Sequence, residues 1–200
     1  MRRLMRRLSV LVLTGLVVAC APTPYPRPYG YHRIEFPARS YQRYERPGCS
    51  FSFEYPTYAV VQPTTRRDSC FVDIFFPQFN AYWHLTDRDF ARDHADRIQS
   101  FEDYRKVVYK HSQKATNIRD TPHQWPGGNG VLFELWGAVP TSAQLYLSDS
   151  LNNALMASFY FKTAAKNDSL APVIEFLKAD LLHLAETVRF TGGCCPPQKP

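Results

Sequence analysis

The sequence has no apolar run long enough to cross a bilayer as a helix, which takes about 20 residues. Its longest run, residues 8–19, is shorter than that and follows a start that contains four arginines. A positive start before a short apolar core is typical of a secretory signal. We therefore expect residues 1–19 to be an export signal that is removed from the mature protein.

Standard catalytic motifs are also missing. The sequence has no Gly-x-Ser-x-Gly elbow, no His-Glu-x-x-His pair, no phosphate-binding glycine loop and no dinucleotide fingerprint. Its one glycine-rich stretch, residues 127–130, is expected to be a turn, because no predicted helix follows it to receive a phosphate. We expect a protein that is not an enzyme and uses no cofactor.

The mature chain has little excess charge. The full chain has 24 Lys+Arg and 18 Asp+Glu, and four arginines belong to the signal, so the mature balance is 20 − 18 = +2. An exported protein with so small an excess gives no reason to expect nucleic acid as a partner.

The end of the apolar run resembles a second processing signal. Val17-Val18-Ala19-Cys20 is similar to the lipobox that the bacterial lipoprotein peptidase recognises, so Cys20 is the expected lipidation site. The alternative is an ordinary secreted protein with a cysteine near its cleavage site. Acyl chains on Cys20 would anchor the protein in a membrane, because each buried methylene contributes about 0.8 kcal/mol.

Proline density separates a tether from the folded part of the chain. Prolines recur through residues 20–32 and disfavour a helix or a central strand, so we expect an extended tether after Cys20. Residues 33–190 are long enough for a single α+β domain. Residues 191–200 form an expected disordered tail, in which Cys194 and Cys195 have no assigned role.

Alternating apolar residues predict β-strands in both halves of the domain. The predicted strands are 33–36, 50–55, 58–62, 71–76, 131–139, 143–148 and 154–161. Because the connections between the last three are short, these three are expected to form an antiparallel meander.

Two helices are predicted. The first runs from about Asp87 to His111 and is capped at residues 86–89, with these side chains facing inward: Ile98, Phe101, Tyr104 and Val108. The second runs from about Ser169 to Thr187 and has an apolar stripe made of Leu170, Val173, Ile174, Leu177, Leu181 and Leu184. This order of elements predicts an α+β fold, an antiparallel β-sheet covered by two main helices.

An acidic cluster near the start of the first helix suggests a metal site. Its members are Asp87, Asp89, Asp93, His94 and Asp96. Carboxylates and imidazole are good metal ligands, but arginines are interleaved at i,i+4 spacing, as between Arg92 and Asp96. We favour an ion-paired helix face and expect no metal.

Two further features leave alternatives open. Cys49 and Cys70 border predicted strands, and in an oxidising compartment they can form a disulfide or remain reduced. Arg39, Arg43 and Arg46 alternate with aromatic residues and are a possible partner-contact site. An edge strand followed by a loop is the favoured explanation of the same pattern.

Several segments, taken in order, resemble the gliding-motility-associated lipoprotein GldD family of the Bacteroidota. They are residues 28–37, 49–61, 70–77, 144–150, 158–161, 167–173, 176–180 and 186–187. Together they span nearly the whole predicted domain. The chain departs from the family in having Ser148-Asp149-Ser150 where Thr-Asp-Ser is usual, and in lacking an Arg-Gly pair near Met156.

The resemblance implies a non-enzymatic, lipid-anchored component required for gliding motility and for assembly of the type IX secretion apparatus. Its expected place is the periplasmic face of the inner or the outer membrane, with other proteins of that machinery as partners. The element order is also similar to the PsbP/Mog1-like α-β-α sandwich. The alternative is a periplasmic lipoprotein that binds an apolar or cell-wall ligand between sheet and helix, near residues such as Phe133, Trp136 and Tyr160.

Overall fold

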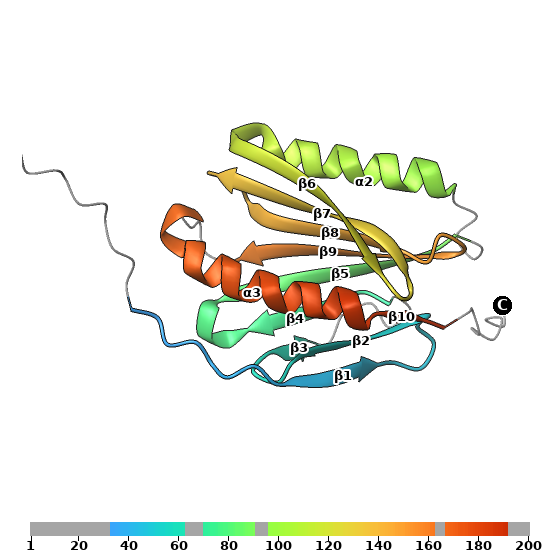
Figure 1. Ribbon diagram of the computed structural model, residues 1–200, viewed down its shortest axis with the longest axis horizontal. Coiled ribbons are helices and arrows are strands. Elements are labelled where there is room, and N and C mark those ends of the chain that lie inside the picture. The colour runs from blue at the N-terminus through green and yellow to red at the C-terminus, as the bar shows by residue number, and fades with distance from the viewer. Residues whose placement is uncertain (1–32, 63–69, 91–95, 163–166, 192–200) are drawn as a thin grey trace, which may run out of the picture. The chain divides into compact units, whose positions relative to one another are not determined.

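The computed structural model describes residues 33–62, 70–90, 96–162 and 167–191 (Figure 1). Four expectations therefore lie outside the described residues. They are the signal at 1–19, the tether at 20–32, the lipidation of Cys20, and the tail from residue 192 with Cys194 and Cys195. None of the helices in the described ranges is both long and apolar enough to cross a membrane.

Two antiparallel sheets form the framework. The strands of the larger sheet are β3 (Val60–Gln62), β4 (Val72–Phe76), β5 (Ala81–Asp89), β6 (Ala115–Trp125), β7 (Gly128–Gly137), β8 (Thr141–Ser148) and β9 (Asn153–Phe161). Those of the smaller sheet are β1 (Tyr41–Glu45), β2 (Phe51–Pro56) and β10 (Arg189–Phe190). The larger sheet has the order β3-β4-β5-β9-β8-β7-β6, and the smaller has the order β1-β2-β10.

Two long helices lie on opposite faces of the larger sheet (Figure 1). They are α2 (Arg97–His111) and α3 (Asn167–Thr187), and two short 3₁₀ helices, η1 (Pro77–Phe79) and η2 (Ser112–Lys114), complete the elements. The smaller sheet lies on the α3 side, where β2 packs against α3. This side of the larger sheet therefore meets both a helix and a second sheet.

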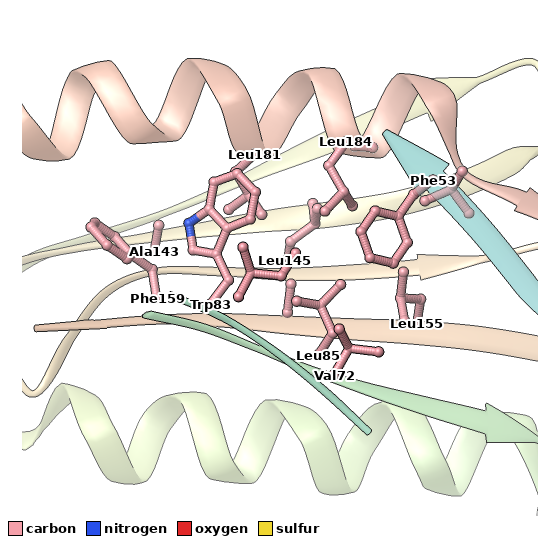
Figure 2. Packing of buried hydrophobic residues seen from close by; sticks show 14 of the residues in the cluster. Phe53, Val72, Trp83, Leu85, Ala143, Leu145, Leu155, Phe159, Leu181 and Leu184 are labelled. Atoms are coloured by element: carbon pink, nitrogen blue, oxygen red, sulfur yellow. The ribbon is translucent and has the colours of Figure 1, made fainter. Parts of the chain in front are cut away.

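The main core lies between the larger sheet and α3 (Figure 2). Alternate residues of the strands enter it, among them Trp83 and Leu85 on β5 and Leu145 on β8. From α3, Leu177, Leu181 and Leu184 enter it and are almost completely buried, as the predicted stripe requires, while Leu170 and Ile174 are half-buried. Burial of such a stripe supplies most of a helix's stability, because isolated helices are marginal in water.

A smaller core lies between the larger sheet and α2. Tyr104 and Val108 are buried against side chains of β7 and β8, including Phe133 and Tyr146. The Tyr104 hydroxyl donates a hydrogen bond to the Leu145 carbonyl oxygen at 3.2 Å. These contacts place α2 above β7, β8 and the start of β9.

The first helix starts later than predicted. Residues 87–89 belong to β5, and α2 begins at Arg97 with Asp96 as its N-cap, whose side chain accepts from the Gln99 amide at 2.8 Å. The physical reason is the alternation of Ala81, Trp83 and Leu85 into the core, which continues the strand to Asp89. The inward prediction for Ile98 is wrong, because its exposed fraction is 75%.

Some strand predictions also need correction. Residues 33–36 form no strand, and the predictions omitted β1, β5, β6 and β10. The expected turn at residues 127–130 is shorter, because Gly128 and Gly130 belong to β7. A Cβ at Gly130 would overlap the carbonyl oxygen of Tyr146 on β8, so the close strand approach requires glycine there.

Cys49 and Cys70 form a disulfide, with their Cα atoms 5.5 Å apart. Cys49 precedes β2 and Cys70 precedes β4, so the bond joins the smaller sheet to the larger one. The α+β class with antiparallel sheets agrees with prediction, but the helices cover less of the sheet than expected. On the α2 side, no described helix lies over β3, β4 or β5.

Candidate functional site

Asp180 on α3 is a fully buried carboxylate that accepts three side-chain hydrogen bonds. The donors are the Tyr41 hydroxyl at 2.9 Å, Arg39 Nε at 3.1 Å and the Tyr58 hydroxyl. Tyr41 is the first residue of β1, Arg39 lies two residues before it, and Tyr58 lies between β2 and β3. We call these four residues the Asp180 clasp, because they bind the first described segment of the chain to its last helix.

The donor roles in the clasp are fixed by burial. Burial and, second to it, the hydrogen bond to Asp180 together raise the pKa of Tyr41 to about 12. Burial and then the hydrogen bond to Asp180 also raise the pKa of Tyr58. Both phenols are therefore protonated at neutral pH, and the carboxylate is the acceptor.

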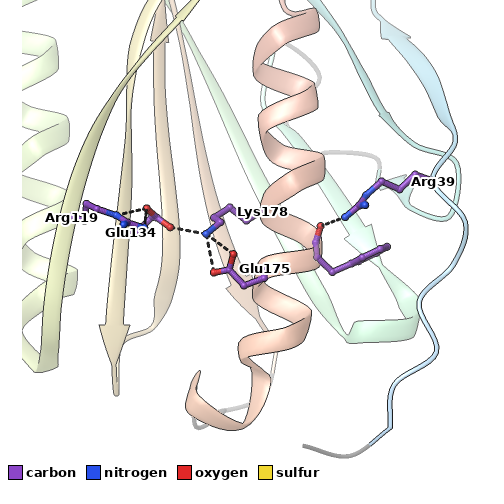
Figure 3. Close-up of polar contacts among 6 residues, drawn as sticks. Arg39, Arg119, Glu134, Glu175 and Lys178 are labelled. Atoms are coloured by element: carbon purple, nitrogen blue, oxygen red, sulfur yellow. Dashed lines mark hydrogen bonds and ion pairs between the residues drawn. The ribbon is translucent and has the colours of Figure 1, made fainter.

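Aromatic packing reinforces the clasp. The Arg39 guanidinium lies 4.5 Å from the centroid of the Phe176 ring, and its Nη2 donates to the Phe176 carbonyl oxygen at 3.3 Å. Figure 3 shows Arg39 reaching from the first segment of the chain toward α3. Phe36 stacks on Phe176 with ring centroids 4.5 Å apart, and Tyr41 stacks on His183 at 3.6 Å. Residues 36–41 are thus held along α3 by both polar and apolar contacts.

A second polar centre joins α3 to β7 and to the edge strand β6 of the larger sheet (Figure 3). Glu134 on β7 is buried, and its carboxylate contacts Lys178 Nζ and Arg119 Nη2, each at 2.8 Å. Lys178 also pairs with Glu175 at 2.7 Å. Burial alone would raise the pKa of Glu134, but the hydrogen bonds from Lys178 and Arg119 outweigh it and lower that pKa.

Both centres use their charges to bind elements of the protein to one another. Asp180 links α3 to β1, and Glu134 links α3 to β6 and β7. Within the described ranges, no group of three or more His, Cys, Asp or Glu side chains is placed to hold a metal ion. The geometry gives these residues a structural role, that of joining α3 to β1 and to β6 and β7.

The acidic cluster does not form the predicted helix face. Asp87 and Asp89 lie on β5, and Asp96 caps α2. Asp93 and His94 lie outside the described residues. The prediction failed because the strand continues through the charged residues that were expected to open the helix.

The three predicted partner-contact arginines all have internal contacts. Arg39 belongs to the Asp180 clasp, and Arg43 donates to the Ser52 hydroxyl at 2.8 Å. Arg46 hydrogen-bonds the Tyr44 side chain. β1 is an edge strand of the smaller sheet, as the alternative explanation expected. Partner contact through Arg43 and Arg46 stays a prediction.

The residues proposed to line a ligand pocket do not share a face of the sheet. Phe133 and Tyr160 lie on the α2 side, and Trp136 lies on the α3 side near Arg119. Trp136 therefore cannot line the same pocket between sheet and helix as Phe133 and Tyr160.

Sequence reasoning missed Asp180 and Glu134. Glu134 is a single charged residue between Phe133 and Leu135, and Asp180 lies directly before Leu181 within the apolar stripe of α3. A buried carboxylate has to be paired, so this interruption is the available signal. The partners themselves lie too far along the chain to be identified from it.

The fold is similar to those of known proteins at low sequence identity. PsbP (CyanoP) of Synechocystis sp. PCC 6803 has a TM-score of 0.46 and 11% identity, over 80% of this chain and 97% of that one. The Ran-binding protein Mog1p of Saccharomyces cerevisiae has a TM-score of 0.50 and 9% identity, over 76% and 96%. The likeness to Mog1p supports the Mog1-like fold alone.

The sequence comparisons identify a family. No curated protein sequence matches the chain. The model of the family described as gliding motility lipoprotein GldD matches residues 21–190, which include both the Asp180 clasp and the Glu134 centre. The chain therefore belongs to the gliding motility lipoprotein GldD family.

Proposed function

We propose that this chain is a non-enzymatic, lipid-anchored component required for gliding motility and for assembly of the type IX secretion apparatus. Membership of the GldD lipoprotein family supports the link to gliding and to a membrane. Cys20 is the residue that we expect to carry the lipid, on the periplasmic face. The proposed partners are other proteins of the same machinery.

The observation that carries this proposal is the Asp180 clasp. A pull on a lipid at Cys20 reaches the domain through Arg33 and the residues that follow it. The clasp fixes this segment to α3, whose apolar stripe is buried in the main core. Tension is therefore passed to the most deeply packed helix, which suits a component that must keep its place in a moving assembly.

The anchor is tested by complementation of a deletion strain with the Cys20→Ala variant. We expect the variant to leave the membrane fraction and to support neither colony spreading nor secretion of a type IX cargo, because it has no acylation site. Wild-type spreading and secretion by a variant that has left the membrane would contradict the proposed function.

The clasp is tested by Asp180→Asn in the same strain, with Glu175→Gln as its matched control. Both changes remove one carboxylate, but the side chain of Asp180 is fully buried, whereas that of Glu175 is 60% exposed. We expect Asp180→Asn to stay in the membrane fraction and to reduce spreading, because an NH2 donor replaces one of the two acceptor oxygens and the negative charge beside Arg39 is lost. Equal spreading by the two variants would remove the mechanical role of the clasp.

A further inference from the structure

The larger sheet is unequally covered on its two faces. α3 and the smaller sheet pack on one face, whereas α2 packs on the other only above β7, β8 and the start of β9. Among the described elements, none lies over the α2 side of β3, β4 and β5, and at the end of β9 the His111 ring of α2 lies 6.2 Å from the ring of Tyr160. We call this region the open half of the sheet.

Aromatic and aliphatic side chains form a row across the open half. Its members lie directly opposite one another on neighbouring strands and are Val60, Phe75, Tyr82 and Tyr160. Val60 is 53% exposed, and the three rings are half-buried. The rings of Phe75 and Tyr82 have centroids 4.6 Å apart. A continuous apolar row that remains accessible is typical of an interaction surface.

A polar row runs beside the aromatic one and leads to α2. Its members are Gln62, Asp73, His84, Ser158 and Gln144. Asp73 pairs with His84, and both side chains are more than two-fifths exposed, at 42% and 47%. Gln144 is fully buried, and its Nε2 lies 3.4 Å from Nδ1 of His111, the last residue of α2.

The end of α2 that lies beside the open half is basic. From Tyr104 to Lys114 the sequence has four basic residues and no Asp or Glu. Arg105 and Lys106 pair with acidic residues one turn earlier in α2. Lys110 and Lys114 are exposed and, within the described part of the chain, form no ion pair. They flank His111, whose ring centroid lies 6.2 Å from that of Tyr160.

The shape of the open half selects among possible occupants. A helix with its side chains is about 10–12 Å wide, so α2 stands above the uncovered strands and forms a step beside them. A flat bilayer would therefore touch α2 before it reached Tyr82. A second copy related by a twofold axis would present the same basic surface, and two surfaces of like charge are unfavourable at an interface.

An additional helix fits this step. Strands are about 4.8 Å apart, so one helix covers two to three of them, which matches the uncovered strands beside α2. Its apolar stripe would pack on the aromatic row, and acidic residues on one flank would face Lys110 and Lys114.

We propose that the open half binds an amphipathic helix of a partner protein, with its apolar stripe on Phe75, Tyr82 and Tyr160 and its acidic flank toward Lys110 and Lys114. This inference rests on the proposed assembly role, since it takes the partner to be another envelope protein. It adds the binding surface and the chemistry that recognises the partner.

Site-specific photocrosslinking in the gliding bacterium tests the proposal on the full chain. The photoreactive residue p-benzoylphenylalanine replaces Tyr82, or replaces the exposed Gln42 on β1 as the control position. We expect the Tyr82 position alone to give an adduct with one other envelope protein. The crosslinked peptide should have apolar residues at i, i+3, i+4 and i+7 with Asp or Glu on one flank.

Charge reversal then tests the recognition. Lys110→Glu with Lys114→Glu should lower the adduct yield about tenfold, because like charges replace attractive ones. Arg189→Glu makes the same kind of charge reversal at an exposed position on the smaller sheet and should leave the yield unchanged. Should the double reversal unfold the protein, Lys114→Gln is the second variant, and it should give a smaller loss.

Several outcomes would overturn the inference. They are an adduct with a second copy of this chain, an adduct with lipid alone, no adduct specific to the Tyr82 position, and a yield that charge reversal does not change. Motility that depends on Cys20 while Tyr82 gives no adduct would reject this surface and leave the proposed function standing.

Discussion

The two long helices lie on opposite faces of one sheet but differ in how they use their side chains. α3 buries an apolar stripe from Val173 to Leu184 and contributes the fully buried Asp180. α2 buries Tyr104 and Val108 and exposes three large apolar side chains, those of Ile98, Val107 and Tyr109. α3 is therefore part of the framework of the domain, whereas α2 leaves most of its surface exposed to solvent.

Their charges differ in the same way. α2 has four Lys or Arg and two Asp or Glu, so its formal charge is 4 − 2 = +2, whereas α3 has one and four, so its charge is 1 − 4 = −3. On α3, Asp180, Glu175 and Lys178 are bound within the domain. The comparison indicates that α3 stabilises the domain, whereas α2 leaves most of its charged and apolar side chains exposed.

The largest expected effect comes from Leu181→Ala on α3. Leu181 is 1% exposed in the main core, and truncation of a buried leucine lowers the free energy of unfolding by about 3–5 kcal/mol. The matched change on α2, Ile98→Ala, should alter it by less than about 0.5 kcal/mol, because Ile98 is 75% exposed. Urea denaturation of the purified variants checks both values, and similar losses would contradict the division of roles between the helices.

The next effect concerns the disulfide, which lies on the α3 side. It joins residues separated by 21 positions, and the chain-entropy estimate for such a loop is about 3 kcal/mol. We expect Cys49→Ala with Cys70→Ala to lower the free energy of unfolding by that amount. Amide hydrogen exchange should increase in β1, β2 and β10 before it increases in α2. Faster exchange in α2 alone would show that the bond supports the other face.

Glu134→Gln should have a smaller effect that depends on pH. The folded pKa of Glu134 lies below its unfolded value of 4.5, so its stabilisation is present above pH 4.5 and is lost as the pH falls through the folded pKa. We expect the variant to be less stable by about 2 kcal/mol at pH 7. The difference from wild type should shrink below pH 4.5. Urea midpoints measured between pH 3 and 7 check this, and a constant difference would count against the Glu134 centre.

The elements that follow a clear apolar period were predictable from the sequence. The α3 stripe at i, i+3 and i+4 placed that helix, and alternation placed β2, β4 and the last three strands of the sheet. β6 was not predicted from the sequence, because residues 116–122 are all exposed and no alternation of apolar and polar residues marks this edge strand. β5 was not predicted from the sequence, because its charged end, residues 87–89, has the composition of a helix start.

The polar centres were not predictable, because their members are far apart in the sequence. Tyr41 and Asp180 are 139 positions apart, and Glu134 and Lys178 are 44 positions apart. The alternation of arginines with aromatic residues made Arg39 a candidate partner contact, whereas the structure places it against Phe176 and Asp180. The accessible rows of the open half became visible only with the strand register, since a pairing shifted by one residue would exchange the two faces of a strand.

The smallest expected difference in stability is between two variants that each lose a tyrosine hydroxyl, one on the α3 side of the sheet and one on the α2 side. Tyr41 donates to the Asp180 carboxylate, whereas Tyr104 on α2 donates to the Leu145 carbonyl oxygen. A hydrogen bond to a charged group is the stronger kind. We therefore expect Tyr41→Phe to lower the free energy of unfolding by about 1.5 kcal/mol and Tyr104→Phe by about 1 kcal/mol.

An alkaline titration separates the two tyrosine variants further. The pKa of Tyr41 is raised from 10.0 to about 12 in the folded protein. Its contribution is therefore fully present below pH 10 and is lost as the pH rises through about 12. The stability difference between wild type and Tyr41→Phe should narrow over that interval, as followed by urea denaturation with circular dichroism. A difference that stayed constant above pH 10 would mean that the Tyr41 hydroxyl does not bind Asp180, and the comparison between the two faces would lose its electrostatic part.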